Sequence, residues 1–316
     1  MSKCFVTRLN EVVNNNSLLK MGELRIIVSK VISPSKNSQK LVLAATADTE
    51  IRIIGNGYFT DENISANKGT VMSVTASLGN NTFYVSNGDF EISLKKKHVI
   101  TNIVLGNSLK MEISNLAYCL ELKDIELTST NSTGDISNLI NDKKIRYIGC
   151  NNTALSGDIS SLSGLSNLTS LYLSNKIAKG YLKDINKFTK LQIMSVDNLY
   201  GDLGEITSES ILYISSNISF LTGDLAKLPA QFYMISLTGN LGTLTWTSRP
   251  SSSKIISILG YPKIDNIDTM LINQAQCAES SSSRKVIEVT GTRTSLSDSA
   301  VSTLQSKGYT ISVTPA

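Results

Sequence analysis

The chain has 316 residues, of which 41% are hydrophobic and 18% are charged, so it is long enough for about two domains and too apolar to be disordered. Its net charge of +4 lies in residues 1–99, where Lys95, Lys96 and Lys97 form the one basic run. Three lysines beside a strand are typical of a solvated sheet edge, so we do not expect nucleic-acid binding.

The amino-terminal residues contain no apolar segment of the kind that a secretory signal needs, and no stretch of the chain approaches the length of a membrane span. We therefore expect neither export by a signal peptide nor membrane insertion. The four cysteines, Cys4, Cys119, Cys150 and Cys277, are scattered without paired spacing. This spacing favours a reducing compartment over a disulfide framework or a zinc site.

Residues 1–99 contain short runs of alternating apolar and polar residues, separated in several places by Gly and Asn clusters. The runs lie at 23–28, 41–45, 51–54, 71–76, 83–85 and 90–94. This alternation predicts a small antiparallel β-sandwich or barrel. We expect this domain, residues 1–99, to anchor the protein to a larger assembly or to drive its oligomerisation, and we leave a homo-oligomer open.

From residue 120 onward an apolar pattern recurs, with two or three core residues in each copy. The clearest copies end at Leu127, Cys150, Leu173 and Val196, in steps of 23 residues. We place the next copies at Leu212–Ile214, 18 residues on, and at Phe232–Leu237, with weaker ones at Ile256–Ile258 and Ile287–Val289. A fixed step of this length predicts a solenoid of parallel strands, one strand in each coil.

A second column keeps the same period. Gly followed by Asp and an aliphatic residue recurs, with Asp135, Asp158, Asp202 and Asp224 as its acidic members and Tyr181 in the equivalent place of one copy. Calcium needs about 6–8 oxygen ligands, and one Asp for each coil supplies too few. We interpret these aspartates as turn formers and predict no metal site.

The segment from Leu165 to Asn175, with leucines at 165, 168, 171 and 173, resembles the leucine-rich-repeat family. The resemblance covers residues 118–291. It implies a curved solenoid that binds a partner on its concave face, with Asn152, Asn175 and Asn198 as buried turn residues. We assign the solenoid to residues 100–294.

The carboxyl-terminal part predicts helices. Residues 264–279 favour a helix inside the last long repeat unit. Ser297–Gly308 predicts a second helix, with Ser297 as its N-cap and Gly308 as a left-handed stop, followed by a strand in which Val313 is equivalent to Val289. We assign residues 295–316 as a carboxyl-terminal cap. The predicted fold class is therefore mainly β: a sandwich or barrel, a leucine-rich-repeat solenoid, and a helix–strand cap.

No catalytic motif and no cofactor-binding motif is present. His98 is the sole histidine, and a solvated or structural role is favoured for it. We therefore predict no catalytic residue, no cofactor and no enzyme activity, with a polysaccharide-acting enzyme as a remote alternative.

The predicted concave face carries tyrosines among small polar residues, a mixture suited to a protein or glycan ligand. The residues that we predict to bind the partner are Arg146, Tyr147, Tyr172, Gln192, Ser195, Tyr213, Tyr233 and Ser236.

The opening residues Met1–Leu9 and the style of the repeat are similar to proteins of tailed phages that infect Bacteroidetes. This resemblance implies a virion accessory protein, such as a head or tail fibre component, that contacts other virion proteins through residues 1–99. The alternatives are a cytoplasmic leucine-rich-repeat interaction protein and a cell-surface adhesin.

Overall fold

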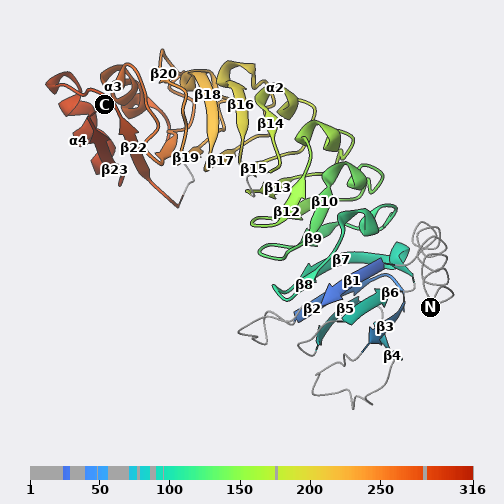
Figure 1. The fold of residues 1–316 in the computed structure, drawn as a ribbon. Helices are drawn as coiled ribbons and strands as arrows, with labels where there is room; N and C mark the ends of the chain where they lie inside the picture. The colour runs from blue at the N-terminus through green and yellow to red at the C-terminus, as the bar shows by residue number, and fades with distance from the viewer. Residues whose placement is uncertain are drawn as a thin grey trace. The chain divides into compact units, whose positions relative to one another are not determined.

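The structure, a computed structural model, describes residues 24–28, 40–47, 49–55, 71–76, 79–85, 90–94, 96–174, 177–279 and 283–315 (Figure 1). The chain divides into two compact units, Met1–Ser156 and Gly157–Ala316. Each unit is described by itself. The predicted domain boundaries after residues 99 and 294 stay predictions.

The first unit begins with antiparallel sheets. Its early strands are β1 (Leu24–Val28), β2 (Lys40–Ala45), β3 (Thr49–Gly55), β4 (Val71–Ala76), β5 (Gly79–Tyr84), β6 (Phe90–Leu94), β7 (Ile100–Leu105) and β8 (Leu109–Lys110). One sheet has the order β4-β3-β6-β1-β8, and in the other β2 lies between β5 and β7. The predicted antiparallel strands are therefore present, and the sheets that they form extend past residue 99 through β7 and β8.

Strand β7 connects the two kinds of sheet in this unit, because it pairs antiparallel with β2 on one side and parallel with β9 on the other. The remaining elements are η1 (Lys97–Val99), η2 (Ile113–Leu116), β9 (Asp124–Glu126), β10 (Thr133–Asp135), η3 (Ile136–Leu139), β11 (Tyr147–Gly149) and β12 (Ala154–Ser156). Strand β11 pairs parallel with β9, and β12 with β10. The parallel coils thus begin on the edge of an antiparallel sheet.

The second unit contains two parallel sheets. The longer one has the strands β13 (Ser170–Leu173), β15 (Ile193–Val196), β17 (Tyr213–Ser216), β19 (Met234–Leu237), β21 (Ser257–Leu259), β22 (Val286–Thr290) and β23 (Thr310–Thr314), in that order. The shorter one has β14 (Gly180–Tyr181), β16 (Leu199–Asp202), β18 (Ser219–Asp224) and β20 (Leu244–Thr245). Each coil thus contributes one strand to the longer sheet, as the repeat predicts.

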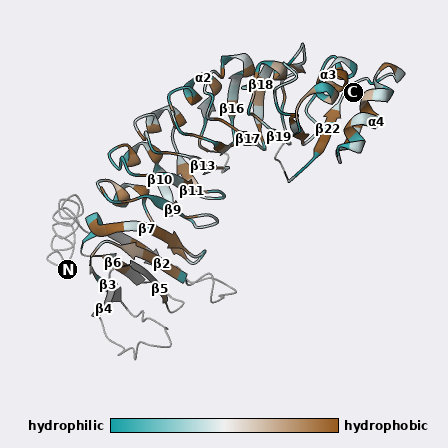
Figure 2. Ribbon diagram, turned by 180° about the vertical axis from the view of Figure 1, so that it is seen from behind, coloured by the Kyte–Doolittle hydropathy of each residue, from teal (hydrophilic) through white to brown (hydrophobic). Residues whose placement is uncertain are grey.

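Short helices complete the coils of the second unit. They are η4 (Ile159–Leu162), α2 (Leu182–Ile185), η5 (Leu203–Glu205), η6 (Leu225–Lys227), α3 (Ile267–Gln276), η7 (Ser295–Ser297) and α4 (Asp298–Ser306). Buried aliphatic residues line the inside of every coil, among them Leu171, Met194, Ile214 and Ile235 at paired positions of successive strands. Figure 2 shows hydrophobic residues recurring along the strands and turns. The predicted fold class, a mainly β chain with a solenoid of parallel strands, is confirmed.

The column of aspartates acts through turns, as predicted. Asp135, Asp158, Asp202 and Asp224 each accept a hydrogen bond from the backbone N–H two residues later, at the start of a 3-10 helix. The glycine before each one has a positive φ, for example +117° at Gly157, a conformation that L side chains rarely adopt. Tyr181 occupies the same place before α2 and makes no capping bond.

Replacing Asp158 with alanine is expected to cost about 1 kcal/mol of unfolding free energy, because the Ser160 N–H loses its 2.9 Å acceptor at the N-cap. Asp158→Asn should lose much less, since its amide oxygen still accepts the bond. Equilibrium urea unfolding of the two variants measures the difference. Equal stability of the alanine variant and the original chain would contradict the capping role.

One repeat unit has a different register from the one predicted. In the structure Leu237 pairs with Ser216, and Met194 pairs with Ile214, so the buried triplet of this coil is Ile211, Ile214 and Ser216. Ile214 is a core residue as predicted, but it occupies the middle position of the triplet and not the last, and the prediction is wrong at Leu212, which is half-buried. A fully buried serine occupies the last core position, and its hydroxyl donates to Ile218 O at 2.7 Å, which offsets its desolvation.

The family's column of buried asparagines is also not formed as predicted. Asn152 is exposed and has a φ of +54°, and the buried Thr153 hydroxyl donates to Cys150 O instead. Asn198 is half-buried, and Asn175 lies outside the described residues. Asn240 performs the expected role two coils later, because its side chain bonds Ser219, both backbone groups of Leu221, and Gly242 O.

The carboxyl-terminal elements agree with the sequence in kind and place. The helix predicted within 264–279 is α3, and α4 ends before Gly308, which has a φ of +86°. Val313 pairs with Val289, as predicted. Ser297 is the N-cap of α4 but makes no capping bond; its hydroxyl donates to Asp268 of α3 at 2.6 Å.

The lysine run is not a solvated edge throughout. Lys97 is only 2% exposed, and its ammonium group donates to Asn115 O at 3.3 Å and Ala117 O at 2.6 Å. Lys96 is exposed, and Lys95 lies outside the described residues. The expectation of three solvated lysines is therefore wrong at Lys97, because its long side chain reaches carbonyl groups of η2 and of the residue that follows it.

Candidate functional site

The outward residues of the longer sheet of unit two form two columns. Strand pairing places Tyr172, Ser195, Ser215, Ser236 and Leu259 in one column, and Ser170, Ile193, Tyr213, Met234 and Ser257 in the other. The columns are on the face opposite the buried Leu171, Met194 and Ile214, because side chains alternate along a strand. One column is rich in hydroxyl groups, and the other is more apolar.

Three tyrosines come together on this face. The pKa of the Tyr172 phenol is raised by burial, and further by the neighbouring phenols of Tyr213 and Tyr233. Tyr213 precedes Ile214 in β17, while Tyr233 lies just before β19. All three rings are half-buried, so each presents apolar area together with a hydroxyl group. We call Tyr172, Tyr213 and Tyr233 the tyrosine cluster.

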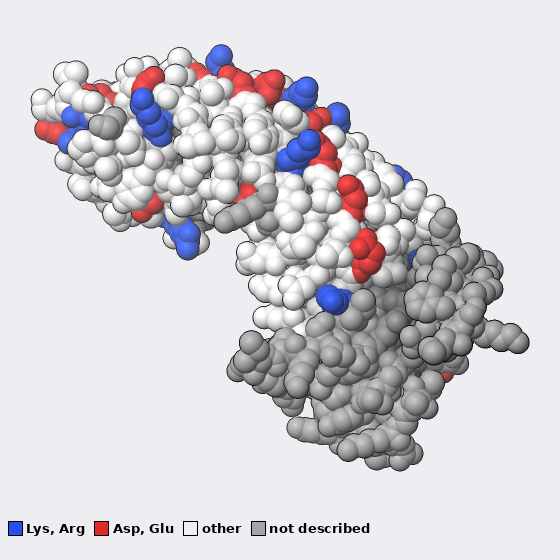
Figure 3. All heavy atoms as spheres, in the orientation of Figure 1, with Lys and Arg blue, Asp and Glu red and all other residues white. Residues whose placement is uncertain are grey.

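From β13 to β21, none of the positions in the two columns carries a charged side chain; farther along the same face, Glu288 of β22 accepts a hydrogen bond from the Gly260 N–H at 3.2 Å. Figure 3 shows many charged side chains along the margin that carries α2 and the neighbouring turns, and others near the carboxyl-terminal end. The face around the tyrosine cluster is therefore suited to contacts by shape and hydrogen bonding, and ion pairs play little part in it.

The other predicted residues of this unit lie near the cluster with different exposure. Gln192 is exposed just before β15, and Ser236 is half-buried in β19. Ser195 is only 9% exposed, and its hydroxyl is 2.9 Å from that of Ser174. Ser195 therefore presents little surface to a ligand.

Arg146 and Tyr147 belong to the first unit, where both take part in hydrogen bonds. Arg146 makes a bidentate ion pair with Asp124, through Nε at 2.8 Å and Nη2 at 2.9 Å, and Tyr147 donates to Glu126 at 2.7 Å. The bond between Tyr147 and Glu126 passes over Gly149. A side chain at this position would collide with it, because an added Cβ would lie 2.3 Å from a Glu126 oxygen. These side chains are already held by intramolecular partners.

Sequence reasoning missed two features of the second unit. Ser215 belongs to the hydroxyl column but was hidden by the register error at Ser216. On the shorter sheet, the rings of Tyr181, Tyr200 and Phe220 stack at centroid distances of 5.6 and 5.2 Å. The sequence gives no fixed-offset signal for this aromatic ladder, because Tyr181 follows the glycine of its repeat, Tyr200 precedes it, and Phe220 lies three residues before it; strand pairing brings the three into line.

His98 and Cys119, two described residues of the first unit, carry groups that are often reactive in enzymes. His98 is exposed in the middle of η1. Cys119 is buried, and burial, with the nearby Asp142, raises the pKa of its thiol to about 12, so it stays protonated. In the described part of the chain, no group of three or more His, Cys, Asp or Glu side chains is placed to hold a metal ion.

The burial of the Asp142 carboxyl leads us to predict that the stability of the protein depends on pH. It is fully buried, and burial raises the pKa of its carboxyl to about 7, although Lys97 and the N–H groups of Tyr118 and Cys119 favour the charged form. These amides do not reach hydrogen-bonding geometry with its oxygens. Because the folded state holds this proton more tightly than the unfolded state, stability should fall as pH rises from about 4 to about 7, by about 1.4 kcal/mol for each pH unit, and then level off.

The test is urea unfolding of the original chain and of Asp142→Asn between pH 4.5 and 8. The asparagine stays neutral, so its stability relative to the original chain should increase across this range and level off above pH 7. Parallel stability curves for the two proteins would show that Asp142 titrates normally.

No protein-family model and no curated protein matches the sequence. Among solved structures, the chain is similar to an internalin of Listeria monocytogenes, with 18% identity and a TM-score of 0.45 over 68% of this chain and 67% of the internalin. It is also similar to the leucine-rich-repeat ectodomain of a plant membrane receptor kinase from Arabidopsis thaliana, solved in complex with Casparian strip integrity factor 2. That match has 20% identity and a TM-score of 0.39, over 60% of this chain and 29% of the ectodomain chain.

No helix among the described residues has the length and apolarity that crossing a membrane requires.

Proposed function

We propose that this chain is a non-enzymatic recognition protein, and that the unit formed by residues 157–316 binds a protein partner on the face of the tyrosine cluster. The observation that carries the proposal is the convergence of Tyr172, Tyr213 and Tyr233 on an uncharged strand face. Tyrosine buries a large area at a low entropy cost and retains a hydroxyl group for hydrogen bonding.

A protein segment suits this face better than a glycan does. Tyr213 pairs with Ile193 and Met234, so an apolar strip runs beside the strip of Ser195, Ser215 and Ser236. Apolar side chains of a partner would pack on the first strip, and its backbone would bond to the half-buried hydroxyls of Ser215 and Ser236 in the second. Met234 adds an adaptable, polarisable surface.

The experiment is to pan a random-peptide display library against the full chain and, in parallel, to probe a glycan array with it. We expect peptides with spaced apolar side chains to be enriched and the array to stay blank. Because the face is uncharged, the affinity of the selected peptides should change by less than about threefold between low and high salt. Selective glycan binding, or affinity lost in high salt, would contradict the proposal.

We further propose that residues 1–99 attach the chain to a larger assembly, specifically a phage virion. The likeness of Met1–Leu9 and of the repeat to phage proteins supports it. Mass spectrometry of purified phage particles should detect this chain at a constant copy number. Recovery of the chain only from host cells, and never from particles, would favour the cytoplasmic or cell-surface alternative.

A further inference from the structure

The last strand of the longer sheet, β23, has an unpaired edge. In the part of the chain that the structure describes, β22 is the one strand that pairs with it. Its sequence, Thr310–Thr314, contains no charged residue and no proline. Such an edge is a template for pairing with another strand unless the protein blocks it.

The hydrogen bonds to β22 show which backbone groups are directed outward. Thr310 N–H donates to Lys285 O, and Gly291 N–H donates to Thr314 O, both at 2.9 Å. In a parallel pair every second residue directs both its backbone groups at the same neighbour. Thr310, Ser312 and Thr314 therefore face β22, and the N–H and C=O groups of Ile311 and Val313 face away from it.

The ends of this edge are closed on both sides. The Tyr309 N–H already donates to Leu304 O at 3.0 Å, and Pro315 has no N–H to donate. The outward groups that can pair thus belong to Ile311 and Val313, which are symmetric about Ser312.

We propose that β23 pairs antiparallel with β23 of a second copy of this chain, about a two-fold axis at Ser312. In this register Ile311 lies opposite Val313 of the second copy, and each such pair exchanges two backbone hydrogen bonds. All four outward N–H and C=O groups are then satisfied. In a register shifted by one residue, Ile311 and Val313 would lie opposite residues of the second copy whose backbone groups already bond to β22. None of the outward N–H and C=O groups would then find a partner.

The side chains match in the same register. The segment reads Thr-Ile-Ser-Val-Thr, so antiparallel pairing places threonine opposite threonine, isoleucine opposite valine, and serine opposite serine. Ile311 and Val313 pair with the buried Ile287 and Val289 but remain partly exposed. The second copy would therefore extend an apolar layer that is incomplete at this edge.

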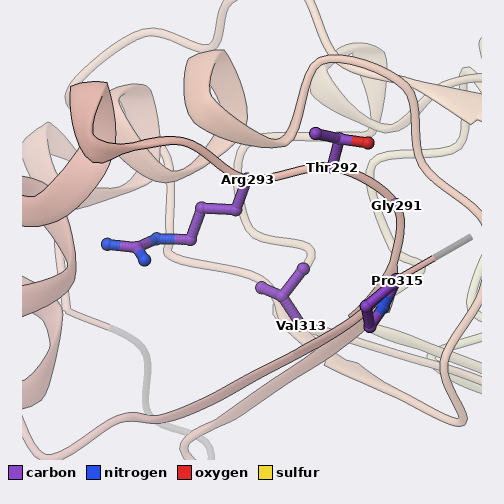
Figure 4. Close-up of a pocket in the computed structure, with 5 residues that line it drawn as sticks. All are labelled: Gly291, Thr292, Arg293, Val313 and Pro315. Carbon is purple, nitrogen blue, oxygen red and sulfur yellow. The ribbon is translucent and has the colours of Figure 1, made fainter.

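A hollow lies beside Val313, lined by Gly291, Thr292, Arg293, Val313 and Pro315 (Figure 4). In the proposed pairing, Ile311 of the second copy packs against Val313 on this side of the sheet and covers part of the hollow. A two-fold contact of this kind uses the same patch on both subunits.

Cysteine cross-linking tests the register, in a background with Cys4→Ser so that the remaining native thiols, Cys119, Cys150 and Cys277, are buried. Opposed residues of a non-hydrogen-bonded pair have Cα atoms about 4.5 Å apart, within the range of a disulfide. Ser312→Cys should therefore give a disulfide-linked dimer under mild oxidation. Thr310→Cys is the matched control, because it lies opposite Thr314 and should link at least about tenfold more slowly.

Light scattering after size-exclusion chromatography provides the second readout. The full chain should have twice the monomer mass at high concentration, and Val313→Pro, which removes an outward N–H without touching the bonds to β22, should shift it to monomer. A monomeric full chain, equal cross-linking at positions 310 and 312, or a dimer that Val313→Pro leaves intact would each overturn the proposal. The cross-linking pair keeps the test valid if the proline variant fails to fold.

Discussion

Replacing Arg249 with methionine is expected to lower the free energy of unfolding by about 2–5 kcal/mol, because two buried carbonyl groups each lose their donor. Arg249 is 2% exposed. Its Nη1 donates to Leu228 O at 2.8 Å, and its Nη2 donates to Pro229 O at 2.9 Å, with longer contacts to Leu225 O and Ala226 O. These carbonyl groups belong to the short helix η6 and to the two residues that follow it.

Methionine fills much of the space but donates no hydrogen bond, so the buried carbonyl groups lose their donors and keep their desolvation cost. Arg249→Lys should lose less, since one ammonium group still reaches one or two of the carbonyls. The matched control is Lys227→Met, which removes a cation from an exposed position of the same helix. Urea unfolding measures all three variants. A loss below about 1 kcal/mol for Arg249→Met would show that the carbonyl groups are satisfied without it.

Two adjacent substitutions in β13 are expected to have opposite consequences. Leu171→Ala should cost about 2–5 kcal/mol of stability, because Leu171 is fully buried and pairs with the buried Met194 in the interior of the coils. Tyr172→Ala should cost about 1 kcal/mol or less in stability, since its ring is half-buried on the opposite face. It should instead weaken peptide binding by about tenfold or more.

Comparing these two variants distinguishes a loss of stability from a loss of peptide binding at two consecutive residues. Leu171→Ala should leave the affinity of the folded fraction within about threefold of the original. Thermal unfolding and peptide titration on both variants supply the four values. A large stability loss at Tyr172, or an affinity loss confined to Leu171, would show that the two faces have been assigned the wrong way round.

Much of the fold could be predicted because the repeat encodes it twice. Aliphatic residues such as Leu171, Met194 and Ile235 mark the strands, and the glycines with positive φ, each followed by Asp, mark the turns. Both signals are local, so each coil carries its own evidence. The antiparallel strands before residue 99 were visible through the same local alternation.

The rest depended on tertiary contacts that sequence patterns do not contain. Ser216 is buried because its hydroxyl finds a backbone acceptor, and Lys97 because carbonyl groups meet its ammonium. The register error at Ser216 also misplaced Tyr213, which the sequence set beside Ser195 and Ser236. In the structure Tyr213 pairs with Ile193 and Met234 in the neighbouring column. The candidate face was therefore found, but the arrangement of its residues was not.

The most direct test of the tyrosine cluster compares two triple-alanine variants against the peptides selected by the full chain. One variant replaces Tyr172, Tyr213 and Tyr233, and the other replaces the aromatic ladder of Tyr181, Tyr200 and Phe220, which is on the shorter sheet. With circular dichroism and melting temperature confirming that both are folded, isothermal titration should show a loss of at least about a hundredfold in affinity for the first and less than about threefold for the second. Equal losses in the two variants, or a loss confined to the ladder variant, would contradict recognition by this face.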